Sequence, residues 1–361
     1  MPRLRPRTPL LAALATALAL LALPTLAAAK PWIGVRGNQL IDAAGNPVRL
    51  LGVNRAGSEG KCVHREGFFE GPTDTPSIEA MQRWHINAVR VPLNESCWLG
   101  INWVPPAFGG NAYRAEIKSF VDRLESAGLY VILDLQWASP KTFPAEGLLP
   151  LPDAEHAPEF WRTLASEYRE DRSVLFDIYN EPRPGVSWEC WQLGCEIEDH
   201  WVGRYQAVGM TQLIEVVRST GAEQPIMVPG VDWARDLRGW LSHLPADPLN
   251  SLVASNHTYN VTPCKQTCRG VLARIAQTHP VVTGEIGEGD CRHRYIDNYM
   301  PWADRNGISY LAWAWTSGPE WSCKEGPSLI KEYGGSPTNY GIGFREHLRE
   351  LNRTAKATPA P

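Results

Sequence analysis

The sequence predicts a (β/α)8 barrel, in which eight parallel strands close into a ring surrounded by helices, with a short N-terminal β-hairpin before it. Two observations lead to this fold class. Short runs of Val, Ile and Leu alternate with amphipathic stretches, and eight such runs fall between residues 50 and 315. The chain has 361 residues, and an α/β barrel of about 250 residues or more folds as one unit. A doubly wound open sheet is the alternative, but no G-x-G-x-x-G motif follows an early strand, which argues against its nucleotide-binding form.

The elements are expected in the following order. Residues 32–49 predict a hairpin around a turn at 44–47, placed to close the N-terminal end of the barrel. Strands are expected at 50–54, 88–92, 130–136, 174–180, 225–230, 252–257, 281–285 and 309–315. Thr75 followed by Pro76 suits the N-cap and first position of a helix. Apolar residues at helical spacing predict further helices at 113–127, around 160–168, at 201–220 and at 343–352.

The composition is that of an ordinary globular protein, with 43% hydrophobic and 20% charged residues. The formal net charge of −4 provides no strong positive field, so we expect no nucleic-acid partner and no attraction to an anionic membrane. The fifteen tryptophans are a large number for a rare residue, and they suggest flat apolar binding surfaces.

The first 29 residues have the pattern of a secretory signal peptide. Three arginines precede an apolar run at 10–23, and an A-x-A cleavage site ends at Ala29. A membrane anchor is the weaker alternative, since this run is shorter than the roughly 20 residues that a span needs. We therefore expect a leader at 1–29, a catalytic barrel at 30–352 and a short polar tail at 353–361, in a secreted monomer without a membrane anchor after cleavage.

The candidate functional residues close the predicted strands, because chemistry in a barrel sits at the carboxyl ends of the strands. Strand four ends in N-E-P and strand seven ends in a glutamate, within G-E-I-G. Read in this way, the candidates are Asn54, Arg90, Gln136, Trp137, Asn180, Glu181, His257, Tyr259, Glu285, Trp313 and Trp315.

Two carboxylates on opposed strands suit the hydrolysis of a glycosidic bond. One acid must protonate the leaving oxygen while a second carboxylate meets the oxocarbenium-like carbon. Glu181 and Glu285 could instead be solvated surface acids, although each ends an apolar strand. His257 could be a structural histidine, and Arg90 could pair with a strand-end carboxylate. A metal-dependent hydrolase is disfavoured because no H-x-H or H-E-x-x-H motif occurs, so we expect no metal and no cofactor.

With these motifs, the chain from Trp32 to Leu351 resembles glycoside hydrolase family 5, the retaining cellulase-type family of (β/α)8 barrels. The resemblance implies that Glu181 is the general acid and base and that Glu285 is the nucleophile.

The resemblance also implies roles for the neighbouring polar residues and for one tryptophan. Asn180 is expected to bind the 2-hydroxyl of the sugar, and Trp315, with Trp313 second, to stack on it. Arg90, His257 and Tyr259 match polar positions of the family. The chain departs from the family where Gln136 stands in place of the usual His, and Gln can exchange hydrogen bonds but cannot carry a proton.

An even number of cysteines in an exported protein indicates disulfides. Zinc is the alternative, but the two close pairs lack C-x-x-C spacing. In the barrel, all eight cysteines are expected in loops that follow strands. Pairing each cysteine with the next one along the chain gives bridges that do not cross the barrel. The expected bridges are Cys62–Cys97, Cys190–Cys195, Cys264–Cys268 and Cys291–Cys323.

Three functions remain open from the sequence. The first is a secreted endo-β-1,4-glucanase, with a β-linked polysaccharide or oligosaccharide as its substrate. The second is the same chemistry on another β-glycan: mannan, β-1,3- or mixed-linkage glucan, or a glycolipid. The third is a non-catalytic sugar-binding barrel, which the presence of both carboxylates disfavours.

Overall fold

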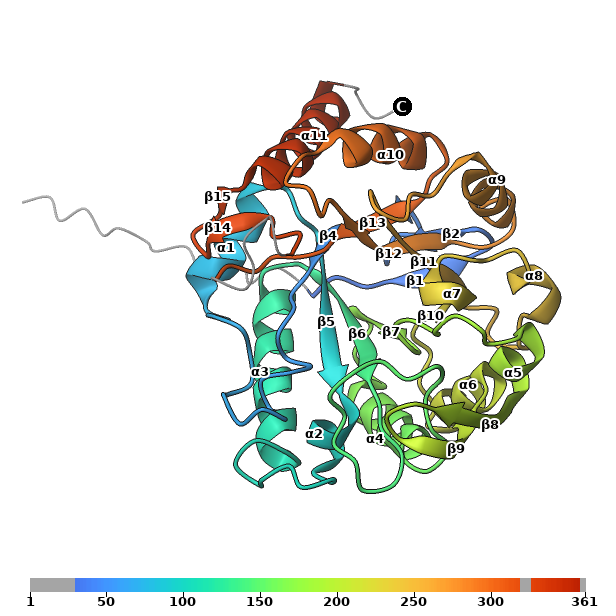
Figure 1. Ribbon diagram of the computed structural model, residues 1–361. Helices are drawn as coiled ribbons and strands as arrows, with labels where there is room; N and C mark the ends of the chain where they lie inside the picture. The colour runs from blue at the N-terminus through green and yellow to red at the C-terminus, as the bar shows by residue number, and fades with distance from the viewer. Residues whose placement is uncertain (1–29, 319–325, 358–361) are drawn as a thin grey trace, which may run out of the picture.

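The computed structural model describes residues 30–318 and 326–357, and eight of its strands close into a barrel (Figure 1). Around the ring the order is β10-β11-β12-β13-β4-β5-β6-β7, and every neighbouring pair is parallel. The predicted (β/α)8 barrel is therefore confirmed. Its strands are β4 (Leu51–Asn54), β5 (Ala88–Asn94), β6 (Tyr130–Trp137), β7 (Val174–Asp177), β10 (Ile226–Pro229), β11 (Leu252–Tyr259), β12 (Val281–Gly287) and β13 (Ser309–Ala312).

All eight predicted strands exist, and their boundaries shift by up to three residues. The largest shifts are at two carboxyl ends, where β7 stops at Asp177 and β13 at Ala312. Asn180, Glu181, Trp313 and Trp315 therefore follow their strands as irregular backbone.

A small antiparallel sheet closes the N-terminal end of the barrel. It consists of β1 (Gly34–Arg36), β2 (Gln39–Ile41) and β3 (Pro47–Val48), so the expected hairpin has a third strand. Ile33 and Leu40 are buried in one cluster with Leu50, which directly precedes β4, and with barrel-strand side chains such as Ile132 and Leu311. This end is filled with apolar side chains, which leaves the opposite end for polar groups.

The helices that follow the strands pack around the barrel through amphipathic faces. In α3 (Asn111–Ser126), the residues at the predicted apolar positions are buried, and the same holds in α4 (Ala157–Tyr168). The others along the outside are α1 (Thr75–Arg83), α6 (Met210–Ser219), α8 (Trp240–His243), α9 (Gln266–Ile275), α10 (Arg294–Arg305) and α11 (Asn339–Ala357). Among the residues described, no helix is both long and apolar enough to cross a membrane.

Short elements fill the loops after the strands. These are α2 (Glu95–Leu99), α5 (Trp188–Leu193), α7 (Val231–Ala234), the hairpin strands β8 (Gly194–Asp199) and β9 (Gly203–Val208), and the pair β14 (Ile330–Glu332) and β15 (Ser336–Pro337).

The helix predicted at 201–220 is wrong in its first half. Residues 203–208 form β9, which pairs antiparallel with β8, and the helix begins only at Met210. Tyr205 and Ala207 are buried while Gln206 is exposed, so this stretch has the alternation of a strand. Gly203, at φ +70°, adopts the left-handed backbone that ends the three-residue turn.

Two helix ends also differ from the expectation. Asp74, not Thr75, is the N-cap of α1, since its side chain accepts a hydrogen bond from Ser77 N at 3.1 Å. The last helix begins earlier than 343 and continues to Ala357, so part of the expected polar tail is helical. The expected leader at 1–29 and the last residues, 358–361, lie outside the described residues.

Candidate active site

The centre of the site is Arg90, which lies on β5 inside the barrel and is fully buried. Its Nε donates a hydrogen bond to Asp177 Oδ2 at 2.9 Å, and its Nη2 lies 3.0 Å from Asp134 Oδ1. Burial opposes the charge on Arg90, but Asp134, Asp177 and Glu285 outweigh it, so the pKa of the guanidinium is raised. Burial raises the pKa of Asp177 to about 6 and that of Asp134 well above its usual value, while Arg90 acts against both shifts.

Arg90 also orients three groups at the mouth of the barrel. Its Nη1 donates to Asn54 Oδ1 at 3.0 Å and to Glu285 Oε1 at 3.1 Å, and its Nη2 donates to Asn180 Oδ1 at 2.9 Å. The amide of Asn54 donates in turn to the carbonyl of Gly284 at 2.9 Å. One buried side chain therefore fixes residues of β4 and β12 and the segment after β7 relative to one another.

Glu285 lies on β12, and its side chain is 5% exposed. Its Oε2 accepts a hydrogen bond from the Tyr259 hydroxyl, and His257 Nδ1 lies 3.6 Å from the same oxygen. Burial raises the pKa of Glu285, and His257, Arg90 and the Tyr259 hydrogen bond act against that shift. Hydrogen bonds from a guanidinium and a phenol favour the carboxylate form of this residue.

Glu181 has a different environment from Glu285. Its Oε1 lies 2.8 Å from His257 Nδ1. Burial lowers the pKa of His257 to about 4, so the imidazole is neutral near pH 7. Burial raises the pKa of Glu181 to about 7, against the opposing charges of Arg90 and Arg235. Glu181 can therefore hold a proton near neutral pH.

The two glutamates lie close together. One oxygen of Glu181, one oxygen of Glu285 and one nitrogen of His257 all lie within 4.8 Å of one another. Retaining glycosidases hold their two carboxyls about 5–5.5 Å apart and inverting ones about 6.5–9.5 Å apart. The short distance between the two carboxyls favours a retaining mechanism.

Two glycines make room for these side chains. A Cβ at Gly287 would lie 2.4 Å from the Tyr259 ring, and one at Gly284 would lie 2.9 Å from His257 Nε2. A larger residue at either position would displace a side chain that contacts the glutamates. The sequence G-E-I-G on β12 thus combines the candidate carboxyl of Glu285 with the space that its neighbours Tyr259 and His257 need.

The remaining predicted residues lie at the mouth with different exposures. Gln136 is buried on β6, and Trp137, which ends this strand, is half-buried with its ring 6.5 Å from that of His64. Trp315 is fully buried and packs edge-on against Trp84 at 4.9 Å, so its ring has no free face for a sugar. Trp313 is only partly buried, and the order of the two tryptophans as sugar-stacking residues stays a prediction.

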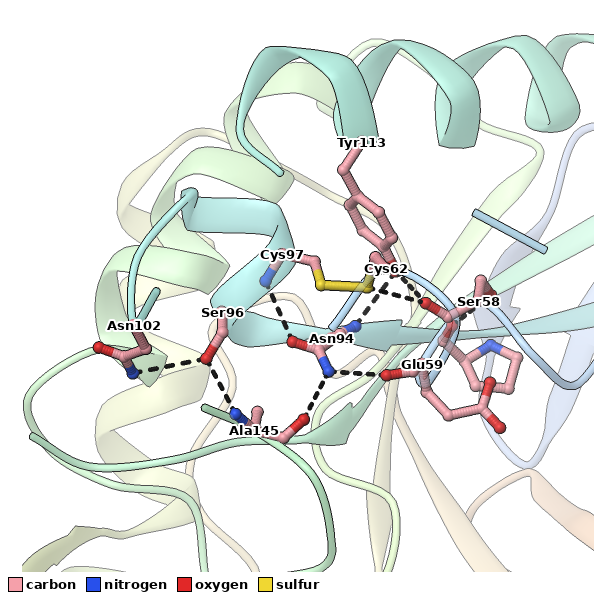
Figure 2. The surroundings of a disulfide bond; sticks show 10 residues. Ser58, Glu59, Cys62, Asn94, Ser96, Cys97, Asn102, Tyr113 and Ala145 are labelled. Carbon is pink, nitrogen blue, oxygen red and sulfur yellow. Dashed lines mark hydrogen bonds between the residues drawn. A yellow bond between two sulfur atoms is a disulfide. The ribbon is translucent and has the colours of Figure 1, made fainter. Parts of the chain in front are cut away.

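Sequence reasoning missed a buried network beside the glutamates. Glu59, after β4, has a pKa raised to about 7 by burial, and the charge of Glu285 adds to this shift. Asn94 Nδ2 donates to the carbonyls of Glu59 at 2.7 Å and Ala145 at 2.8 Å, and its Oδ1 accepts from Cys97 N at 3.0 Å (Figure 2). Asn94 therefore ties together three loops of the mouth. It ends β5 two residues beyond the predicted strand, and reading the strand to its true end would have found it.

Two groups of side chains in the described ranges could hold a metal ion. One is Glu181, His257 and Glu285, and the other is Glu95, Asp153 and His156. In the second group burial raises the pKa of Glu95 and of Asp153, and His156 Nδ1 lies 3.0 Å from the carbonyl of Ser139. This group joins α2 to the loop before α4.

Three of the four expected disulfides are confirmed. They are Cys62–Cys97, Cys190–Cys195 and Cys264–Cys268, with Cα–Cα distances of 6.2, 5.1 and 5.2 Å. Some of these cysteines lie in regular elements and not in irregular loops: Cys97 is in α2, Cys190 in α5 and Cys195 in β8. Cys323 lies outside the described residues, so its pairing with Cys291 stays a prediction.

A cavity of about 540 Å³ opens beside His257. Its walls are the segment 232–238 after β10 and the segment 258–272, which contains the Cys264–Cys268 bridge. His257 is the candidate site residue in its lining.

Comparison with known proteins identifies relatives across most of the chain. Residues 41–319 match the family model described as Cellulase (glycosyl hydrolase family 5). An endoglucanase A from Butyrivibrio fibrisolvens is 23% identical over 78% of this chain, and the alignment spans 59% of that relative's length. A beta-mannanase/endoglucanase A from Caldicellulosiruptor saccharolyticus is 25% identical over 74% of this chain and 18% of the relative.

Solved structures share the fold. A beta-glucanase from Saccharophagus degradans, crystallised in complex with cellotetraose, superposes with a TM-score of 0.67 at 20% identity. The match covers 89% of this chain and 94% of that one.

Proposed function

Since the chain belongs to the cellulase family, glycosyl hydrolase family 5, we propose that it is a retaining endo-β-1,4-glucanase with Glu181 as general acid and base and Glu285 as nucleophile. The observation that carries this proposal is the pair of glutamates, whose oxygens lie within 4.8 Å in unlike environments. Burial raises the pKa of both glutamates, that of Glu181 to about 7, but Glu285 also accepts hydrogen bonds from Arg90 and Tyr259 that favour its ionised form.

In the first step, Glu285 attacks the anomeric carbon while Glu181 donates its proton to the leaving oxygen. The glycosidic bond breaks, and a covalent glycosyl-enzyme forms on Glu285. As the ester forms, the attacking oxygen of Glu285 gives up the hydrogen bond it accepts, which comes from Arg90 at Oε1 or from Tyr259 at Oε2. The neutral His257 holds the Glu181 carboxyl in place without competing as an acid.

In the second step, Glu181 acts as the base. It takes a proton from a water molecule, whose oxygen attacks the anomeric carbon and breaks the bond to Glu285. Both glutamates return to their starting protonation states. Two inversions at one carbon give net retention of configuration.

The substrate of this proposal is a β-linked glucan that lies across the barrel mouth. Asn180 accepts from Arg90 through Oδ1, which leaves its amide group to bind a sugar hydroxyl. Trp137 and Trp313 are the proposed aromatic contacts, with Asn54 and Gln136 as polar neighbours. The leader pattern at 1–29 and the three disulfides support export, and we propose that the mature protein acts as a monomer.

Hydrolysis of mannan is the second candidate, because one relative carries both a mannanase and an endoglucanase name. Product analysis on carboxymethylcellulose, mannan and laminarin distinguishes these substrates. Cello-oligosaccharides released from carboxymethylcellulose with a fall in viscosity are expected from an endoglucanase. Activity confined to mannan or laminarin would reject β-1,4-glucan as the substrate, and inactivity on all three would favour a binding protein.

The roles of the glutamates are tested with a dinitrophenyl cellobioside, whose leaving group needs no protonation. Glu181→Ala should still form the glycosyl-enzyme, stall at deglycosylation and be rescued by azide to give the β-azide. Glu285→Ala should show neither a burst nor a β-azide. A β-azide product from Glu285→Ala alone would reverse the two assignments, and initial products of inverted configuration by NMR would reject retention.

A further inference from the structure

The hairpin formed by β8 and β9 carries an exposed tryptophan at its tip. It lies outside the ring of barrel strands, between β7 and α6 in the chain (Figure 1). Trp201 is 78% exposed, although hydrogen bonds hold the backbone of the turn that carries it. An exposed ring costs solvation free energy that a fold-stabilising tryptophan would avoid by burial.

The backbone under Trp201 is held firmly. Asp199 Oδ1 accepts hydrogen bonds from Trp201 N at 2.9 Å and from Val202 N at 3.2 Å. The other oxygen of Asp199 binds Arg183 Nη1 at 2.8 Å, and Lys141 Nζ donates to the carbonyl of Val202 at 3.2 Å. The Cys190–Cys195 bridge closes the base of the hairpin. An exposed ring on a fixed backbone loses little entropy when it binds a ligand.

A cavity of about 380 Å³ lies beside this ring. Trp201 and Val202 form one wall, and the loop after β6 forms the other, including Phe143, which is 44% exposed. Aromatic and apolar walls with a few polar groups suit the C–H face of a sugar ring. The acids that line the cavity, Glu146 and Asp199, disfavour an anionic ligand.

The loop that lines this cavity begins at the barrel mouth. Ala138 and Ser139, which line the cavity, directly follow Trp137 at the end of β6. Arg183 N, two residues after Glu181, donates to the carbonyl of Pro150 at 3.0 Å, and the Tyr179 hydroxyl donates to the carbonyl of Leu149 at 2.8 Å. The segment that holds the proposed acid is therefore bonded to the cavity wall.

We propose that Trp201, with Phe143 opposite, forms a distal subsite for a neutral β-glucan chain that extends from the catalytic centre. The proposal rests on the function proposed above and adds a binding position on the hairpin. It predicts that the enzyme prefers long chains and that this preference depends on the Trp201 ring.

The test compares substrates of increasing length, from an aryl cellobioside to cellohexaose. Trp201→Ala should lower kcat/KM for cellohexaose roughly threefold to tenfold, the size of one aromatic contact, and leave the aryl cellobioside unchanged. Trp201→Tyr should restore most of the loss. The thermal midpoint should stay near that of the wild type, because the side chain is exposed.

The matched control is Trp103→Ala, since Trp103 is 79% exposed and lies in the loop after α2. It should leave the chain-length dependence unchanged. An equal loss in this control, an equal loss on both substrates or no loss in Trp201→Ala would overturn the subsite. So would a wild-type dimer in sedimentation that Trp201→Ala dissociates, since a second copy would then occupy the cavity. Wild-type inactivity on every cello-oligosaccharide would instead refute the proposed function.

Discussion

Removing the Tyr259 hydroxyl should shift the pH dependence of catalysis in one direction. This hydroxyl donates a hydrogen bond to Glu285 Oε2, and the Glu285 side chain is only 5% exposed. A hydrogen bond to a charged group contributes about 1.5–3 kcal/mol, and a change of one pH unit corresponds to about 1.4 kcal/mol. Tyr259→Phe should therefore move the acid limb of kcat/KM upward by about 1 to 2 pH units.

The sign follows from the form that each group must have. The hydrogen bond favours ionised Glu285, so its loss raises the pKa of Glu285, and a higher pH is needed to form the nucleophile. The alkaline limb reports the proton on Glu181, and it should stay in place. The assay is the pH profile of kcat/KM on an aryl cellobioside, which reports the free enzyme.

Tyr340→Phe is the matched control. The Tyr340 side chain is fully buried, and its hydroxyl donates to the carbonyl of Ile286 at 2.8 Å, next to Glu285 in the chain. Its loss should reduce stability by about 1 kcal/mol without moving the acid limb. An unshifted acid limb in Tyr259→Phe, or an equal shift in the control, would refute the reasoning.

Three other predictions follow from the same contacts. The wild-type kcat/KM should fall above about pH 7, as Glu181 loses its proton, and a profile still rising at pH 9 would contradict its role as the acid. Gly287→Ala should lower kcat/KM roughly 100-fold with an unchanged far-UV spectrum, because the new Cβ would displace Tyr259; near-normal kinetics would show that the ring can move harmlessly. The double variant Cys62→Ala with Cys97→Ala opens a bridge of sequence separation 35 and should lose about 4 kcal/mol of unfolding free energy in urea, whereas a loss below about 1 kcal/mol would argue against the loop-closure model.

The barrel could be predicted from sequence because its strands are buried on both sides and read as continuous apolar runs. Polar residues that end such runs stand out, so Glu181, Glu285 and Arg90 could be predicted as candidates. Their contacts could not be predicted, since they join residues up to 195 positions apart, as in the hydrogen bond from Arg90 to Glu285.

The errors have identifiable physical causes. Between 201 and 208, apolar residues at 201, 205 and 208 imitate a helical stripe, while the shorter alternation around Tyr205 and the left-handed Gly203 specify a hairpin. The order of Trp315 and Trp313 as sugar-stacking residues stays a prediction, since both tryptophans follow the same apolar run. β13 ends at Ala312, before either tryptophan. The direction of each tryptophan ring therefore cannot be predicted from the alternation of side chains along a strand.

Arg90 has a consequence for how this protein can change over generations. Its guanidinium neutralises part of a buried acidic cluster and at the same time orients Glu285 and Asn180. A neutral residue there would remove the positive charge that offsets Asp134 and Asp177 and, in the same event, the hydrogen bonds that orient Glu285 and Asn180. Folding and turnover are therefore under joint selection at this position, and new specificities must arise elsewhere, in loops that evolution can vary without risk to the barrel.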